Sequence, residues 1–345
     1  MHMADALISP AVGGAMWAAS AGLTGYSARK LKEGLDERRV PLMGVLGAFI
    51  FAAQMINFTI PATGSSGHLG GGMILAILLG PYAAFLTMAS ILTVQALFFA
   101  DGGLLALGCN IFNLGFFPCF IAYPLIYQKI AGRQPSRRRI LLVALLAAVV
   151  ALQLGALGVV LETYCSGISE LPLTTFALLM QPIHLAIGLV EGLVTAAVVA
   201  FVWQARPEIL ALAPASPPAG PRLLRPVLLS LLAVTLATAG VLSWFASTHP
   251  DGLEWSLKGA TGQEELAAPK NPLHGALAWA QEKVALLPDY DFRKPEQNPA
   301  TPKEDSWPEI NAGKSLAGIL GAGLTLLLAG VIGLGIRRYC APGKG

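Results

Sequence analysis

Long runs without a charged side chain constrain this chain more than any other feature. Residues 140–161, for example, contain no Asp, Glu, Lys or Arg. A helix of about 20 apolar residues can cross the ~30 Å hydrocarbon core of a bilayer. The apolar runs lie at about 9–27, 41–57, 69–80, 82–100, 106–128, 139–161, 176–203, 226–247 and 315–336. The sequence therefore predicts an all-α integral membrane protein with nine apolar helices.

The third run is too short to span a bilayer alone. We expect a tilted or broken helix there, with Gly80 and Pro81 turning the chain into the fourth run, because proline interrupts helical hydrogen bonding. Composition agrees with a membrane protein, since only 12% of the 345 residues are charged and 54% are hydrophobic. Soluble domains carry about 25% charged residues. A soluble enzyme, a disordered chain and a disulfide scaffold are thereby excluded.

Basic residues indicate the orientation. Sixteen of the 23 Lys and Arg residues follow spans one, five, seven and nine, and they fall on one side if nine spans alternate. The positive-inside rule makes that side the cytoplasm. The N-terminus is then outside, the C-terminus is cytoplasmic, and the protein is a multi-pass protein of the bacterial inner (plasma) membrane.

A Pro/Ala-rich stretch at 206–225 divides the chain. We expect a seven-span domain at 1–205, a cytoplasmic linker at 206–225 and a two-span appendage at 226–345. The appendage carries a long extracytoplasmic segment, about 248–314, with more acidic than basic residues. Its Pro, Glu, Asn and Lys content after 286 predicts a lightly folded or partly disordered segment.

His2 gives the chain a special metal-binding chemistry. The amine of Met1, the amide nitrogen of His2 and its imidazole Nδ1 can chelate one ion through unstrained five- and six-membered rings. One more imidazole completes a square-planar set of four nitrogens, a geometry that favours Ni(II) or Cu(II). His68 is the obvious fourth donor, because it lies in an outer Gly/Ser/Thr loop that can fold inward. The alternative is that His2 is a solvated residue near a terminus.

Four motifs resemble a known transporter family. They are MHMADALISP at the start, GSSGHLGGG with ILAILLGP behind it, DGGLLALGCNIFNLG at 101–115, and HPDGLEWSL at 249–257. The first three resemble the NikM/CbiM substrate-binding component of energy-coupling factor transporters for nickel and cobalt. The last is similar to the PDGLE motif of the partner subunit NikN. The chain thus resembles a NikM–NikN fusion over nearly its whole length.

The resemblance implies a seven-helix body whose outside N-terminus inserts and holds the metal through Met1, His2 and His68. It implies nickel capture, with cobalt as the alternative cargo. It also implies a transmembrane coupling subunit and two cytoplasmic ATPases as partners in the bilayer. No catalytic residue, resident cofactor or nucleic-acid partner is expected. The chain agrees in having no GxxxxGK[ST] loop, since Pro308 stands where the first glycine before the AGKS run would lie.

Several polar residues are candidates for supporting the metal ligands. Metal-bound imidazoles donate their other N–H to carboxylates, carbonyls or water. The candidates are Asp5, Ser65, Ser66 and His184. Asp5 reads equally well as a carboxylate favoured by a helix dipole, and His184 as a buried residue that fixes helix packing.

For three other residues or groups, a structural role is the favoured or the equal alternative to a functional one. Glu191 shares a helical face with His184 and is favoured as a packing residue. Asp101 is expected to be structural. Small residues at 11, 14, 15, 18, 19 and 22 form a face for helix packing, either within the body or against the coupling subunit.

Other function classes fit the sequence less well. An intramembrane metal-dependent enzyme needs a general base beside the metal, and the chain has no HExxH or H-x-E pattern. An ion channel predicts rings of carboxylates or carbonyls, which the outer loops offer sparsely. A structural subunit in which His2 is incidental is the last alternative.

Overall fold

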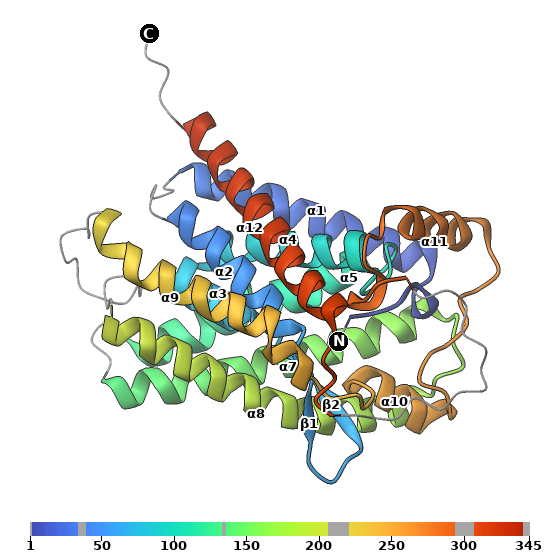
Figure 1. The fold of residues 1–345 in the computed structure, drawn as a ribbon. Helices are drawn as coiled ribbons and strands as arrows, with labels where there is room; N and C mark the ends of the chain where they lie inside the picture. The colour runs from blue at the N-terminus through green and yellow to red at the C-terminus, as the bar shows by residue number, and fades with distance from the viewer. Residues whose placement is uncertain (1, 34–38, 133–135, 206–220, 294–306, 341–345) are drawn as a thin grey trace.

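The computed structural model describes residues 2–33, 39–132, 136–205, 221–293 and 307–340, and these are almost entirely helical (Figure 1). The first part contains α1 (Pro10–Lys32), α2 (Arg39–Gln54), α3 (Gly72–Leu79), α4 (Pro81–Phe99), α5 (Leu107–Ile111), η2 (Phe112–Gln128), α6 (Lys129–Ala131), α7 (Arg137–Ser166) and α8 (Leu173–Ala205). The last part contains α9 (Pro221–Gly240), α10 (Gly252–Thr261), α11 (Pro272–Val284) and α12 (Ala312–Cys340). Short elements are η1 (Asp5–Leu7), η4 (Leu242–Phe245), η5 (Pro288–Tyr290) and the strands β1 (Phe58–Ile60) and β2 (Ser65–Gly67).

Each predicted apolar run coincides with a helix or a continuous helical stretch. Among the described residues, five helical stretches are long and apolar enough to cross a membrane by length and composition, namely 81–99, 107–131, 137–166, 173–205 and 312–338. The predicted all-α membrane fold is therefore confirmed, whereas the number of crossings stays a prediction. Most of the predicted linker lies outside the described residues, so the division of the chain into domains also stays a prediction.

The predicted break between the third and fourth runs is present. Helix α3 has only eight residues, and Gly80 follows it with a φ of 79° before Pro81 begins α4. At 1.5 Å per residue α3 covers about 12 Å, which is too little to span a bilayer. All of its residues are buried, so it lies at the centre of the bundle.

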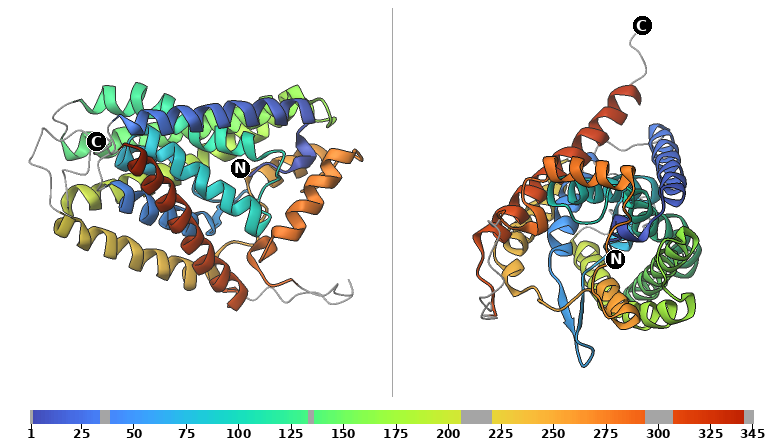
Figure 2. Two further views of the ribbon diagram at one scale, coloured as in Figure 1. Left: turned by 90° about the horizontal axis from the view of Figure 1, so that it is seen from above. Right: turned by 90° about the vertical axis from the view of Figure 1, so that its right-hand side faces the viewer.

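Helix α12 packs closely on α2. A Cβ atom added at Gly321 would lie 2.0 Å from the ring of Phe51, and one at Gly44 would lie 3.1 Å from the carbonyl of Leu326. Small residues at such positions let helix backbones approach each other in a membrane. The last helix is thus joined to the first part of the chain, and Figure 2 shows it running across the outside of the bundle.

The outer segment contains two short helices that its composition did not predict, and how far the part after 286 is ordered stays a prediction. Two helices, α10 and α11, form within it, and residues 294–306 lie outside the described residues. Helix α10 begins with a reciprocal cap in which the Asp251 side chain accepts from the Glu254 amide, while the Glu254 side chain accepts from the Asp251 amide. Composition missed these helices because their order comes from capping and from packing on the body.

The loops sort to opposite ends of the bundle. The β1–β2 hairpin, α10 and α11 lie at one end, and the end of α1, the end of α8 and the start of α9 lie at the other (Figure 1). The first described residues lie at the hairpin end. This arrangement brings segments far apart in sequence to a single place.

Two glycines of α12 provide a test of its packing. We expect Gly321→Ala to destabilise the protein by about 1–3 kcal/mol, the usual cost of overpacking a close contact. Gly323→Ala is the matched control, because a Cβ there meets nothing within 4 Å. The control should be neutral or slightly stabilising, since Ala favours helix over Gly. Thermal unfolding in detergent measures both, and equal melting temperatures would contradict the packing described.

Candidate metal site

The segment 2–8 runs into the bundle. Met3 and Ile8 are fully buried. The Met3 amide donates to Asn110 Oδ1 at 2.8 Å, and its carbonyl accepts from the Gly103 amide at 3.0 Å. The side chain of His2 is 8% exposed as a result. Met1 lies outside the described residues, so its role as a ligand stays a prediction.

The hairpin places His68 beside this segment. Strands β1 and β2 pair antiparallel, with Phe58 opposite Gly67, and His68 follows directly. Its Nδ1 lies 3.1 Å from the carbonyl of Leu69. A carbonyl only accepts hydrogen bonds, so Nδ1 carries the proton and Nε2 carries the lone pair that a metal needs.

The two predicted histidines meet. The ring centroids of His2 and His68 are 4.9 Å apart, and the ring planes differ by 4°. The two rings are stacked in parallel planes, so at least one of them must turn about its side-chain bonds before both can donate to one ion. Burial lowers the pKa of His68 to about 3, so this imidazole is neutral at pH 7 and able to bind a cation.

Two carboxylates face these rings. Asp101 Oδ1 lies 3.1 Å from His2 Nδ1, and Asp251 Oδ2 lies 3.9 Å from His68 Nε2. Burial on its own would raise the pKa of Asp101, but the neighbouring His2 and hydrogen bonds from His2 and Tyr290 outweigh it and lower the pKa to about 2. Both carboxylates therefore bring negative charge to the histidines, because the pKa of Asp251 is also held well below its usual range despite its burial, and the hydrogen bond that its side chain accepts from the Glu254 amide contributes to this.

Sequence reasoning undervalued both carboxylates. Asp101 was expected to be structural, and Asp251 was seen only as part of a motif. The order of residues along the chain gave no signal for Asp251, which is 183 positions from His68. Only packing of the outer segment on the body brings the two together.

The predicted supporting residues have other contacts. Asp5 Oδ1 accepts from the Ala106 amide at 2.9 Å. The Ser66 hydroxyl donates to the carbonyl of His249 at 2.8 Å, and the Ser65 hydroxyl lies within hydrogen-bond distance of the Pro250 carbonyl. The two serines thus contact the outer segment of the appendage, and whether any of the three supports a bound metal stays a prediction.

His184 lies deeper, beneath the histidine pair. Its Nδ1 donates to the carbonyl of Met180 at 2.8 Å, and its buried Nε2 has no hydrogen-bond partner among the described residues. A cavity of about 10 Å³ lies between His184, His68 and Asp251. This volume is near the lower limit for one water molecule.

Glu191 holds the loop behind His68. Its two carboxylate oxygens accept from the amides of Gly70 and Gly71 at 2.9 and 3.0 Å. The Gln54 side chain donates to the carbonyl of Gly70 at 2.8 Å. Gly71 has a φ of 75°, and a Cβ there would meet Ile50 at 2.6 Å, so the turn needs glycine.

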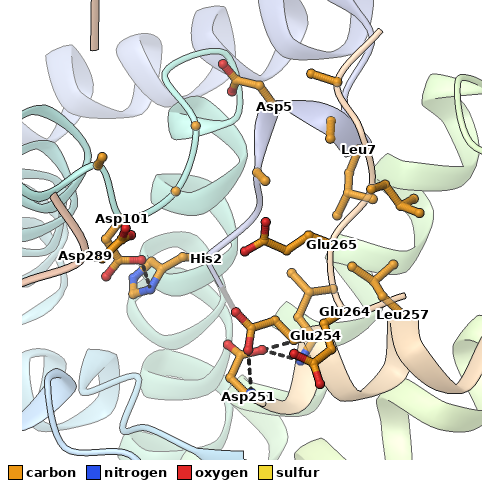
Figure 3. Close-up of a pocket in the computed structure, with 18 of the residues that line it drawn as sticks. His2, Asp5, Leu7, Asp101, Asp251, Glu254, Leu257, Glu264, Glu265 and Asp289 are labelled. Carbon is orange, nitrogen blue, oxygen red and sulfur yellow. Dashed lines mark hydrogen bonds and ion pairs between the residues drawn. The ribbon is translucent and has the colours of Figure 1, made fainter. Parts of the chain in front are cut away.

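A larger cavity opens above the histidines, with a volume of about 610 Å³ (Figure 3). His2, His68 and seven carboxylates line it, and no Lys or Arg of the described chain does. The carboxylates belong to Asp5, Asp101, Asp251, Glu254, Glu264, Glu265 and Asp289. A cleft lined by one sign of charge raises the local concentration of counter-ions. Its chemistry suits a cation.

The side chains alone do not form a complete metal cage. Within the described ranges, no three or more His, Cys, Asp or Glu residues group as a ready metal site. The predicted ligand set takes only two donors from described side chains. Its other donors are main-chain nitrogens at the start of the chain.

Family models match nearly the whole chain. Residues 2–209 match the model described as a cobalt uptake substrate-specific transmembrane region, and residues 225–338 match a PDGLE domain. The resemblance noted from the motifs is thereby confirmed.

Curated relatives match both the whole chain and its first part. A putative fused nickel transport protein NikMN of Archaeoglobus fulgidus is 32% identical over 346 residues, covering 98% of this chain and 99% of its own length. The fused nickel transport protein NikMN of Rhodobacter capsulatus is 32% identical, covering 84% of this chain and 88% of its own. The cobalt transport protein CbiM of Sorangium cellulosum is 32% identical over 49% of this chain and 76% of its own.

A solved structure shares the fold. It is a truncated transition metal transporter with a TM-score of 0.53 and 30% sequence identity. The match covers 59% of this chain and 99% of that one.

The Glu191 contacts predict how the loop behind His68 responds to mutation. Glu191→Ala leaves two buried amides without an acceptor, at about 1–3 kcal/mol each. We expect faster hydrogen exchange at Gly70 and Gly71, measured by mass spectrometry of peptides that cover 68–74. Glu191→Gln keeps one acceptor oxygen and should lose less protection. Wild-type exchange in the Ala variant would show that the carboxylate does not hold the loop.

Proposed function

The chain belongs to the family of cobalt uptake substrate-specific transmembrane regions, with a PDGLE domain behind it, and on that premise we propose that it captures Ni(II) for import. The ligands are the Met1 amine, the amide nitrogen and imidazole of His2, and the imidazole of His68. The observation that carries the proposal is the meeting of His2 and His68 with 4.9 Å between ring centroids. These residues come from segments 66 positions apart, and both are buried below a cavity lined with carboxylates.

Coordination changes the contacts of His2 as well as the stacking of the two rings. The six-membered chelate ring uses His2 Nδ1, which lies 3.1 Å from Asp101 Oδ1. Binding exchanges this contact for the metal. Four nitrogen donors, one of them a deprotonated amide, create the square-planar field that Ni(II) favours. Co(II) is the alternative cargo.

A transport role fits better than an enzymatic one. The two relatives that cover 98% and 84% of the chain are named as nickel transport proteins, and a shorter one is named as a cobalt transport protein. An intramembrane enzyme would need a general base poised over the ion, and the sequence has no pattern for one. The chain is a multi-pass membrane protein, and we place it in the bacterial inner (plasma) membrane with the histidine end outside. The last turn of α1, which carries Arg29, Lys30 and Lys32, lies at the opposite end of the bundle, which supports this orientation (Figure 1).

In this proposal the energy for uptake comes from partners, namely a transmembrane coupling subunit and two cytoplasmic ATPases.

The exposed face of helix α1 supports a contact with a membrane partner. Its small residues at 11, 14, 15, 18 and 22 are exposed rather than packed within the body. A Cβ added at Gly14, Gly22 or Gly25 would meet nothing within 4 Å. Such a face suits close helix contact with another membrane subunit.

An added residue tests the terminal chelate. One glycine placed before Met1 moves the amine out of the ring, so nickel affinity should fall by at least about 100-fold, more than the loss of a supporting residue costs. His68→Ala should cost a similar amount. Isothermal titration in detergent measures both, and a glycine added after Gly345 is the control. Unchanged affinity in the N-terminally extended protein would remove the proposed site.

Competition between metals tests the cargo. Ni(II) exceeds Co(II) in its affinity for nitrogen donors and gains more from a square-planar field. In equilibrium dialysis against equal concentrations of both ions, we expect at least about tenfold more bound nickel, counted by atomic emission. Preferential binding of cobalt would favour the alternative cargo.

A further inference from the structure

Residues 247–250 of the appendage are fixed on the hairpin that carries His68. The Ser66 amide donates to the Pro250 carbonyl at 2.8 Å, and its hydroxyl donates to the His249 carbonyl. The Ser247 amide donates to the Asn57 carbonyl at 2.7 Å. Trp255 adds an indole hydrogen bond to the Thr63 carbonyl at 3.0 Å. These hydrogen bonds therefore fix the position of residues 247–250 relative to the β1–β2 hairpin.

The cap of α10 then orients the Asp251 carboxylate. Its Oδ1 accepts from the amides of Leu253 and Glu254 at 2.8 and 2.9 Å. Its Oδ2 is the atom that lies 3.9 Å from His68 Nε2. A serine or asparagine caps a helix equally well but carries no charge. Aspartate at this position therefore does more than begin the helix.

Gly252 allows this close approach. A Cβ there would lie 3.0 Å from the Cε1 atom of His184 and 2.9 Å from Ile187. A larger residue would push α10 away from the body and Asp251 away from His68. His184 Nε2, which has no described partner, faces the same small cavity as Asp251 and His68.

The net charge of the bound ion and its ligands explains why a carboxylate lies at position 251. Two imidazoles and an amine are neutral ligands, and a deprotonated amide carries one negative charge. A bound Ni(II) ion thus leaves the four-nitrogen set with a net charge of +1. Burying a net charge is costly unless an opposite charge lies near it. Asp101 and Asp251 flank the site on its two histidines.

We infer that Asp251 is a charge-balancing residue of the metal site, supplied by the C-terminal part of the chain. Its carboxylate lies beside the ligand atom of His68 and offsets the charge of the bound ion. This inference rests on the proposed function. It assigns a role to each residue of the Pro-Asp-Gly sequence at 250–252. The Pro250 carbonyl binds the hairpin, the Asp251 carboxylate faces His68, and Gly252 is small enough to allow both contacts.

Asp251→Asn separates charge from folding. Asparagine keeps the helix cap, so the melting temperature of the metal-free full-length protein should stay unchanged. The nickel dissociation constant should rise about 10–100-fold, the usual cost of losing a residue that supports a metal ligand. At saturating nickel the visible d–d absorption band should also shift, because the negative charge beside the bound ion is lost. Glu282→Gln, the same change of charge at an exposed position of α11, should alter neither quantity.

The outcomes are distinct. Wild-type protein that binds nickel together with an Asp251→Asn variant of equal affinity and unchanged spectrum would overturn the inference alone. Wild-type protein that binds no nickel would overturn the proposed function and the inference with it. If the Asn variant does not fold, Asp251→Ser, which also keeps a capping oxygen, carries the same test.

Discussion

Buried peptide groups need hydrogen-bond partners, and this constraint shapes the candidate site. Helices satisfy most of their own peptide groups, whereas buried irregular backbone needs partners from elsewhere in the protein. Here the segments 2–9, 56–71 and 100–106 gather at one end of the bundle and pair with one another and with side chains of α5 and α8. Asn110 and Gly103 bind the main chain of Met3, and Glu191 binds the two glycine amides behind His68. The same hydrogen bonds that make these segments tolerable also hold the two histidines together.

The C-terminal region is built into this arrangement. His274 Nε2 lies 3.1 Å from the carbonyls of both Asp5 and Ile8, and Gln281 donates to the carbonyls of Ala96 and Gly102. Helix α11 thus contacts the N-terminal segment, while α10 contacts the hairpin. A fused chain keeps these contacts at high effective concentration, since the two regions cannot diffuse apart.

Much of the helical layout was predictable from sequence, because apolar runs, Gly80-Pro81 and basic loops are local signals. His2 and His68 could be singled out from their chemistry and their expected side of the membrane. Asp251 could not, because its relation to His68 depends on how α10 packs. The helices of the outer segment could not be predicted from composition either. They depend on the helix cap made by Asp251 and on the hydrogen bond from the Trp255 indole, which composition does not register. Met1 lies outside the described residues, so its part in the chelate rests on chemistry alone.

The two cavities beside the histidines differ greatly in size, about 610 Å³ on one side and about 10 Å³ on the other. A hydrated ion fits only in the larger one. An ion that passes from the carboxylate-lined cavity into the smaller one must therefore shed its hydration shell, because the smaller cavity is near the lower limit for a single water molecule. The step from one cavity to the other thus favours ions whose water is replaced by the nitrogen atoms between them.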